Sequence, residues 1–184
     1  SRRLDTPREF VRTTYYRKWH ELLCDEGLKE RLSRHGYRVA FYPHPNMQRF
    51  LDAFREGCEG VEFCDWRTCD LQDLLRRAAF LVTDYSSVAM DFAYMQKPLL
   101  YYQFDLDEFR ANQYKAGYFD FVRDGFGPVC TTEDEAVAAL TSWAERGRNE
   151  DEYLARCRSF FELHDECNCQ RNYEAIRDWG NHEH

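Results

Sequence analysis

The stretch Phe80-Leu-Val-Thr-Asp-Tyr-Ser-Ser-Val-Ala-Met-Asp-Phe-Ala-Tyr-Met-Gln-Lys-Pro-Leu-Leu-Tyr-Tyr-Gln-Phe-Asp105 predicts a strand, a tight turn, a helix and a second strand. Phe80 to Val82 is a short apolar run typical of a buried strand, and Leu99 to Tyr102 is another. Between them, apolar side chains recur at helical spacing as far as about Met95. Pro98 then stops the helix, because proline has no N–H to donate.

The turn within this stretch is the first candidate site. Ser86 or Ser87 is expected to cap the following helix, because a serine oxygen accepts hydrogen bonds from unpaired N–H groups there. A helix start with two hydroxyls favours a bound phosphate or pyrophosphate. Asp91 lies one turn after Ser87 on the same face, so we expect it to orient a sugar hydroxyl or a base. The plain alternative is a serine cap beside a solvated aspartate.

A second candidate is His44, in the run Pro43-His-Pro45 that follows a predicted strand from Tyr37 to Tyr42. In open α/β sheets, ligands bind beyond the carboxyl ends of the strands. An imidazole at such a position can act as a base or stabilise phosphate oxygens. The alternative is a loop histidine whose ring is satisfied by the backbone.

The rest of the chain repeats the strand–helix order, which is typical of parallel pairing and an α/β fold. The length of 184 residues suits one domain with its own core. The other expected elements are helices at 15–34 (broken near Gly27), 47–56, 70–79, 133–146, 150–163 and 172–179, and strands at 61–64 and 129–130. Asp70 is expected to cap its helix, and Thr131 or Thr132 is expected to cap the helix at 133–146, with Glu135 as a capping-box partner of Thr132. The segment 112–122 is expected to be irregular.

The composition excludes some functions. A formal net charge of −8 argues against nucleic acid or an anionic membrane as a direct partner of this surface. No apolar run approaches the length that crosses a bilayer, and no signal peptide is visible at the start.

The eight cysteines allow two alternatives to free thiols. An even number is compatible with disulfides, but an α/β pattern without an export signal does not need them. His164, Cys167 and Cys169 could form a zinc site with Cys64 or Cys69, although the ligand spacing is poor. We expect reduced thiols and neither a metal nor a cofactor.

Several motifs together resemble the CDP-glycerol:poly(glycerophosphate) glycerophosphotransferases, the teichoic-acid and capsule polymerases and primases. They are Thr83-Asp-Tyr-Ser-Ser87, Asp91-Phe-Ala93, Lys97-Pro98, Tyr101-Tyr-Gln-Phe-Asp105 and the His44-Pro45 pair. The resemblance implies a Rossmann-like parallel sheet flanked by helices, the C-terminal half of a GT-B transferase. It also implies that residues 1–184 are one donor-binding domain, and that the acceptor domain precedes this sequence.

The resemblance implies roles for individual residues. His44 and Asp91 would be catalytic, and Ser86, Ser87 and Thr83 would bind the donor. Arg171 resembles an arginine of the family's final segment and could bind phosphate bidentately, or pair with Asp165 or Glu174 instead. Glu166 stands where the family commonly has a glycine.

The expected reaction transfers a polyol phosphate from a CDP-polyol, CDP-glycerol being favoured, to a polymer hydroxyl and releases CMP. The polymer would bind through the preceding domain, and the protein would lie at the inner face of the cell membrane. The alternatives are a GT-B domain that binds a nucleotide sugar and a non-catalytic nucleotide-binding module.

Overall fold

The computed structural model describes residues 6–106 and 119–181, and its strands form two parallel sheets. The first pairs β1 (Val39–Phe41) with β2 (Val61–Phe63). The second has the order β3-β4-β5, with β3 at Leu81–Thr83, β4 at Leu99–Tyr102 and β5 at Val129–Cys130. The prediction of an α/β fold with parallel strands is confirmed. The segment 112–122, expected to be irregular, lies largely outside the described residues.

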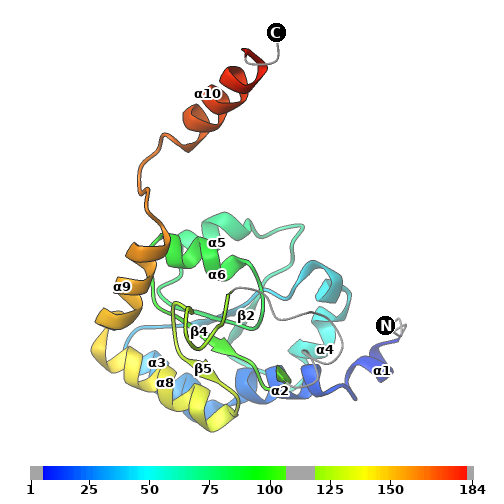
Figure 1. The fold of residues 1–184 in the computed structure, drawn as a ribbon. Helices are drawn as coiled ribbons and strands as arrows, with labels where there is room; N and C mark the ends of the chain where they lie inside the picture. Colours follow the sequence, from blue (N-terminus) through cyan, green and yellow to red (C-terminus); the bar gives the residue numbers. More distant parts are fainter. Residues whose placement is uncertain (1–5, 107–118, 182–184) are drawn as a thin grey trace.

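Helices cover both faces of the strands (Figure 1). On one side lie α5 (Leu71–Arg77) and α6 (Val88–Tyr94), and on the other lie α2 (Thr14–Cys24), α3 (Glu26–Arg34) and α8 (Glu133–Arg146). The remaining helical segments are α1 (Pro7–Phe10), η1 (Pro45–Phe50), α4 (Leu51–Arg55), α9 (Asp151–Phe160) and α10 (Asn168–Asn181).

β4 explains why the fold has three layers. All four of its residues are buried, and successive side chains of a strand point to opposite faces. Leu99 and Tyr101 pack in the core beneath α5 and α6, whereas Leu100 and Tyr102 pack in the core beneath α2, α3 and α8. This apolar strand is therefore buried on both faces, as is usual for parallel sheets.

Local signals set several helix ends as predicted. Asp70 accepts hydrogen bonds from the N–H groups of Gln72 and Asp73 at the start of α5. Thr132 and Glu135 form a capping box at the start of α8. These residues supply partners for N–H groups that have no acceptor within the helix.

Three expected elements differ in detail. The helix predicted at 15–34 breaks at Asp25, two residues before Gly27, because the Asp25 carboxylate accepts from the Leu28 N–H at 2.9 Å and starts a new helix. The helix predicted at 150–163 ends three residues early, at Phe160, which is 44% exposed. The last helix is longer than the predicted 172–179.

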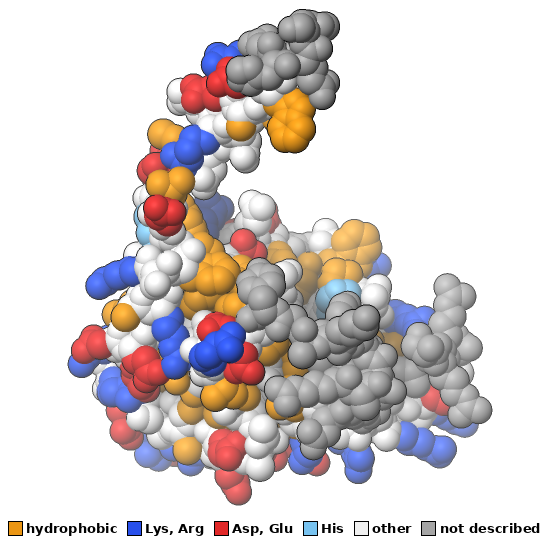
Figure 2. Space-filling view, viewed as in Figure 1, with side chains coloured by type: hydrophobic (Ala, Val, Ile, Leu, Met, Phe, Trp, Pro, Cys, Tyr) orange, Lys and Arg blue, Asp and Glu red, His pale blue; other side chains and the backbone are white. Residues whose placement is uncertain are grey.

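The α10 helix stands away from the layered body (Figure 1). Its apolar side chains at Tyr173, Ile176 and Trp179 are 65%, 74% and 74% exposed. Hydrophobic side chains are visible on this projecting helix in Figure 2.

Candidate functional site at the carboxyl ends of the strands

The turn between β3 and α6 carries most of the predicted site. Thr83 is the last residue of β3 and is buried, so its side chain supports the turn from beneath. The next residue, Asp84, accepts a hydrogen bond from the Tyr85 N–H at 2.7 Å and another from the Ser86 N–H. A carboxylate that accepts hydrogen bonds from the N–H groups of the next residues stabilises a tight turn by itself.

The two serines of the turn differ in what they bind. The Ser86 hydroxyl accepts from the Val88 N–H at 3.4 Å, so it serves as a long, weak cap. Ser87 occupies the cap position, but its side chain makes no capping bond and is exposed. The predicted serine cap is therefore Ser86, and the Ser87 hydroxyl is left for a ligand.

Asp91 lies in the first turn of α6 and is exposed. Since it follows Ser87 by four residues, the two side chains share a helix face, as predicted. Because α6 has only seven residues, its dipole adds little to anion binding here.

His44 caps η1, three residues after the carboxyl end of β1. Its Nδ1 accepts a hydrogen bond from the Asn46 N–H at 3.2 Å, and the side chain is exposed. An Nδ1 that accepts cannot carry the proton of a neutral imidazole, so that proton sits on Nε2. In this arrangement His44 presents an N–H donor to solvent. Such a group is better suited to donating a hydrogen bond to a phosphate oxygen than to abstracting a proton.

A group of polar residues that the sequence reasoning passed over braces the serine turn. Gln103 is only 1% exposed, and its amide nitrogen lies 3.5 Å from the Asp84 carbonyl oxygen. The Tyr85 hydroxyl donates to Oδ1 of Asp105 at 3.0 Å. Both partners follow β4, so the end of one strand holds the turn after its neighbour.

Burial and charge raise two pKa values in this group. The pKa of Asp84 lies above its usual value, first because the carboxyl is buried and further because Asp105 is near. Burial also raises the pKa of Tyr15, and the negative charges of Asp84 and Asp105 add to that shift. Tyr15 therefore remains a neutral phenol beside the two carboxyl groups.

Arg171 lies elsewhere. Its guanidinium binds both carboxylate oxygens of Asp165, at 3.0 and 2.8 Å, and the side-chain oxygen of Asn168 at 2.6 Å. The Asp165 carbonyl accepts from the hydroxyl of Tyr94, the last residue of α6. Seven residues of helix, roughly 10 Å, separate that end from the serines, so the structure does not bring Arg171 to Ser86 and Ser87.

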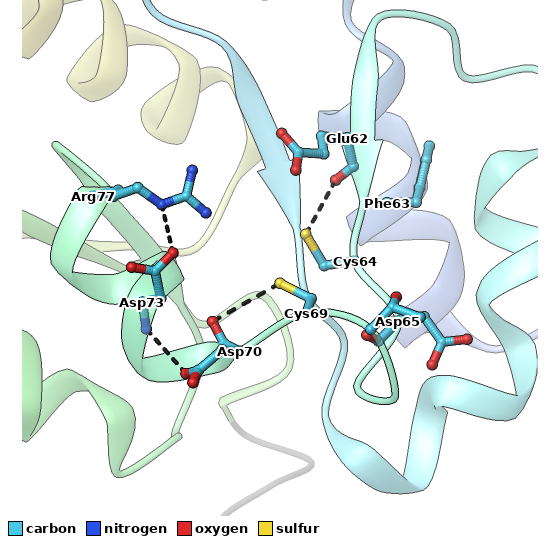
Figure 3. Close-up of a pocket in the computed structure, with 9 residues that line it drawn as sticks. Glu62, Phe63, Cys64, Asp65, Cys69, Asp70, Asp73 and Arg77 are labelled. Carbon is cyan, nitrogen blue, oxygen red and sulfur yellow. Dashed lines mark hydrogen bonds and ion pairs between the residues drawn. The ribbon is translucent and has the colours of Figure 1, made fainter.

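A cavity of about 400 Å³ opens near the carboxyl end of β2 (Figure 3). Its wall includes one guanidinium, Arg77, and four carboxylates, those of Glu62, Asp65, Asp70 and Asp73. The surplus of negative charge makes it a poor place for a phosphate donor. None of the predicted site residues is in its lining.

Within the residues 6–106 and 119–181, no cluster of three or more His, Cys, Asp or Glu side chains could hold a metal ion. The alternative zinc site of His164, Cys167 and Cys169 with Cys64 or Cys69 is therefore wrong, since these side chains do not converge. All eight cysteines are free thiols. Over the same described ranges, no helix combines the length and apolar character needed to cross a bilayer.

Residues 6–178 match the profile of the family described as CDP-glycerol:poly(glycerophosphate) glycerophosphotransferase. The chain belongs to this family. The resemblance seen in the Thr83–Ser87 and Asp91–Ala93 motifs is thereby confirmed.

Three relatives from bacteria show how far the similarity extends. The chain is 33% identical over 174 residues to the minor teichoic acid biosynthesis protein GgaB of Bacillus subtilis (strain 168), covering 94% of this chain and 19% of that protein. It is 46% identical over 77 residues to the teichoic acid glycerol-phosphate primase of the same strain, covering 42% and 19%. It is 34% identical over 71 residues to the teichoic acid glycerol-phosphate transferase of Staphylococcus aureus (strain NCTC 8325 / PS 47), covering 39% and 18%. The matched segments thus cover about a fifth of the length of each of these relatives.

One signal in this family member could have identified the bracing residues. Asp84, Tyr85, Gln103 and Asp105 all belong to the motifs that carry the family resemblance, but these four residues received no role from the sequence. Each of the four lies within three residues of the carboxyl end of a strand, β3 or β4. Polar residues that follow adjacent parallel strands meet at one edge of the sheet, and that rule predicts their proximity.

Proposed function

We propose that this chain is the donor-binding domain of a glycerophosphotransferase that moves a polyol phosphate from a CDP-polyol, with CDP-glycerol favoured, to a hydroxyl of a cell-wall or capsular polymer. The observation that carries the proposal is the exposed Ser87 hydroxyl on a braced turn at the carboxyl end of β3, in a chain of this family. The names of its relatives refer to teichoic acid, glycerol phosphate and ribitol phosphate.

In the proposed reaction, a polymer hydroxyl attacks the β-phosphorus of the donor. The new phosphodiester forms as the bond to CMP breaks, and the hydroxyl proton leaves to solvent or a base. Ser86 and Ser87 hold the pyrophosphate, while Asp91 accepts from a donor hydroxyl. No step in this scheme requires a metal or cofactor. Positioning of the reactants and electrostatic stabilisation of the transition state lower the activation barrier.

His44 acts in this scheme as a hydrogen-bond donor. With Nδ1 engaged by the Asn46 N–H, the Nε2–H donates to a phosphate oxygen or to the leaving CMP. Of the two roles open to the histidine, base or charge stabiliser, the geometry supports the second. A base role requires that the bond to Asn46 first be broken.

Thr83 and Arg171 contribute less directly. Thr83 is 6% exposed and acts by supporting the turn rather than by reaching the donor. Arg171 binds phosphate only if the phosphate replaces Asp165 as its partner, so we assign it a secondary role.

The acceptor polymer would bind a domain outside this chain, and any contact with the inner face of the cell membrane would be made there. The relatives extend far beyond the matched segment, which leaves room for such a domain. We therefore propose a peripheral protein on the cytoplasmic side, where a soluble nucleotide donor is available.

Calorimetric titration with CDP-glycerol, CDP-ribitol, CMP and UDP-glucose tests the proposal. We expect a CDP-polyol to bind most tightly, and Ser87→Ala to weaken it about tenfold, the loss of one charge-assisted hydrogen bond. Ser159→Ala, an exposed serine of α9, is the matched control. Preferential binding of UDP-glucose would instead identify a nucleotide-sugar transferase.

Turnover has to be measured on a protein that includes the acceptor domain. There His44→Ala should lower kcat while His35→Ala, at an exposed position after α3, leaves it unchanged. A protein that binds the CDP-polyol but shows the same turnover with and without His44 would remove that residue from the mechanism. Binding with no turnover at all would point to a non-catalytic module.

A further inference from the structure

Two cysteines face one another across a short turn at the end of β2. Cys64 is buried directly after the strand, Cys69 is partly exposed just before α5, and both line the cavity of about 400 Å³. Both sulfur atoms project to the same side of the turn in Figure 3, and the two thiols are near enough for a side-chain hydrogen bond. The turn between them is held by bonds from the Thr68 and Cys69 N–H groups to the Asp65 carbonyl, at 3.0 and 2.8 Å.

Neither thiol is firmly held in its present position. The Cys64 thiol donates to the Glu62 carbonyl at 3.8 Å, and the Cys69 thiol donates to the Asp70 carbonyl at 4.0 Å. Thiols are weak donors, so exchanging these contacts for a covalent bond costs little. The backbone turn already keeps the two residues close, as disulfide geometry requires.

We propose that Cys64 and Cys69 are a modification site that forms a reversible intramolecular disulfide when a small peroxide reaches the cavity. The Cys69 sulfur attacks one peroxide oxygen, giving a sulfenic acid and one water (for hydrogen peroxide). The Cys64 sulfur then attacks the Cys69 sulfur, the S–O bond breaks, and its oxygen leaves as a second water with the thiol proton. The two thiols lose two electrons in total, and the peroxide O–O bond accepts them.

The order of these steps follows from the surroundings of the two sulfurs. Burial raises the pKa of Cys64 to about 12, and interaction with Cys69 adds to the shift. Since the thiolate is the nucleophile, Cys64 is a poor first reactant. Cys69 is the more exposed of the two and meets the oxidant first, which leaves Cys64 as the resolving thiol.

The site connects to the His44 loop through one side chain. The Gln48 amide nitrogen donates to the Pro43 carbonyl at 3.0 Å and lies 3.4 Å from the Cys64 carbonyl. Its amide oxygen accepts from the Trp66 N–H at 3.4 Å, within the turn that the disulfide closes. Rearranging that turn therefore disturbs the residue next to His44. This consequence for donor binding rests on the proposed function, whereas disulfide formation itself does not.

Peptide mapping under non-reducing conditions tests the site directly. The chain is treated with graded hydrogen peroxide, remaining thiols are alkylated, and the digest is analysed by mass spectrometry. We expect a Cys64–Cys69 linkage that appears before other disulfides and is reversed by dithiothreitol. Cys69→Ser should abolish this linkage, and Cys167→Ser, at an exposed cysteine, should leave it intact.

Other outcomes would overturn the proposal. One is a disulfide found only between Cys24 and Cys58 or only between Cys167 and Cys169. The other is oxidation of Cys69 to the sulfinic acid while Cys64 can still be alkylated. Wild-type mapping gives this answer even if a variant folds poorly. Calorimetry of the oxidised and reduced chain with CDP-glycerol then tests the link to His44: a severalfold loss of affinity on oxidation supports it, and equal affinities reject it. If neither form binds, the proposed function fails while the mapped disulfide stands.

Discussion

The Tyr85 hydroxyl donates a hydrogen bond to Oδ1 of Asp105 at 3.0 Å and so joins the turn after β3 to the segment after β4. Tyr85 lies immediately before the two serines, and its ring also packs edge-to-face on Phe121 at 6.0 Å. The serine turn is therefore held by its neighbours in the sheet and not by the short helix that follows it.

This bond predicts a specific effect of Tyr85→Phe. The ring and its packing remain, but the turn loses one part-buried hydrogen bond, worth about 1 kcal/mol. We expect CDP-glycerol binding to weaken about fivefold while the melting temperature changes little, as measured by calorimetry and thermal unfolding. Tyr94→Phe is the control, because Tyr94 bonds the Asp165 carbonyl at the far end of α6. Equal losses in both variants would mean that the bond does not position the serines.

Asp84 predicts a pH dependence of stability. Burial raises the pKa of Asp84 in the folded chain. At pH values between the ordinary carboxyl pKa and this raised pKa, the folded state therefore binds more protons than the unfolded state. Stability then falls as pH rises through that window. Asp84→Asn removes this cost, and its amide oxygen still accepts from the turn's N–H groups.

Urea unfolding of both proteins across this pH range measures the effect. The free energy of unfolding of Asp84→Asn should rise relative to wild type as pH increases. Asp52→Asn, at an exposed position of α4, should show no such trend. A constant difference between Asp84→Asn and wild type at every pH would contradict the raised pKa.

Sequence patterns predicted the elements better than the contacts between them. The capping residues Asp70 and Thr132 act within three residues of the chain, and apolar β4 is buried wherever it packs, so both were predictable. The bond from Tyr85 to Asp105 joins residues twenty positions apart and depends on the pairing of two strands. The placement of Arg171 depends on where α10 leaves the body, for which no local pattern exists.

Lys97 shows the same limit and predicts a stability effect. From the sequence it is only part of the Lys97-Pro98 motif, but its ammonium group donates to the carbonyls of Leu75 and Ala78 at 3.0 and 2.9 Å, at the end of α5. It therefore caps a second helix. Lys97→Met leaves those carbonyls without this partner and should cost about 2 kcal/mol of unfolding free energy.

Chemical denaturation of Lys97→Met, Lys97→Arg and Lys18→Met tests the cap. Lys18 makes an exposed ion pair with Glu21, so its loss should change stability by no more than about 0.5 kcal/mol. Lys97→Arg keeps donors near the carbonyls and should recover part of the loss. If Lys97→Met is as stable as Lys18→Met, the stability of the chain does not depend on the hydrogen bonds from the Lys97 ammonium group to the end of α5.

Gly127 predicts the largest loss of stability. A Cβ there would lie 1.8 Å from the Leu99 carbonyl oxygen, a main-chain atom of β4 that cannot move without disturbing the sheet. We expect Gly127→Ala to cost at least about 3 kcal/mol in urea unfolding. Gly147→Ala is the matched control: its φ of +67° is unfavourable for alanine, but no atom lies within 4 Å of the added Cβ, so a loss of about 1 kcal/mol is expected.

Because Phe126 is fully buried beside Gly127, a larger loss for Gly127→Ala would show that this loop is packed against β4 rather than resting on the surface. Similar losses in the two variants would contradict that packing.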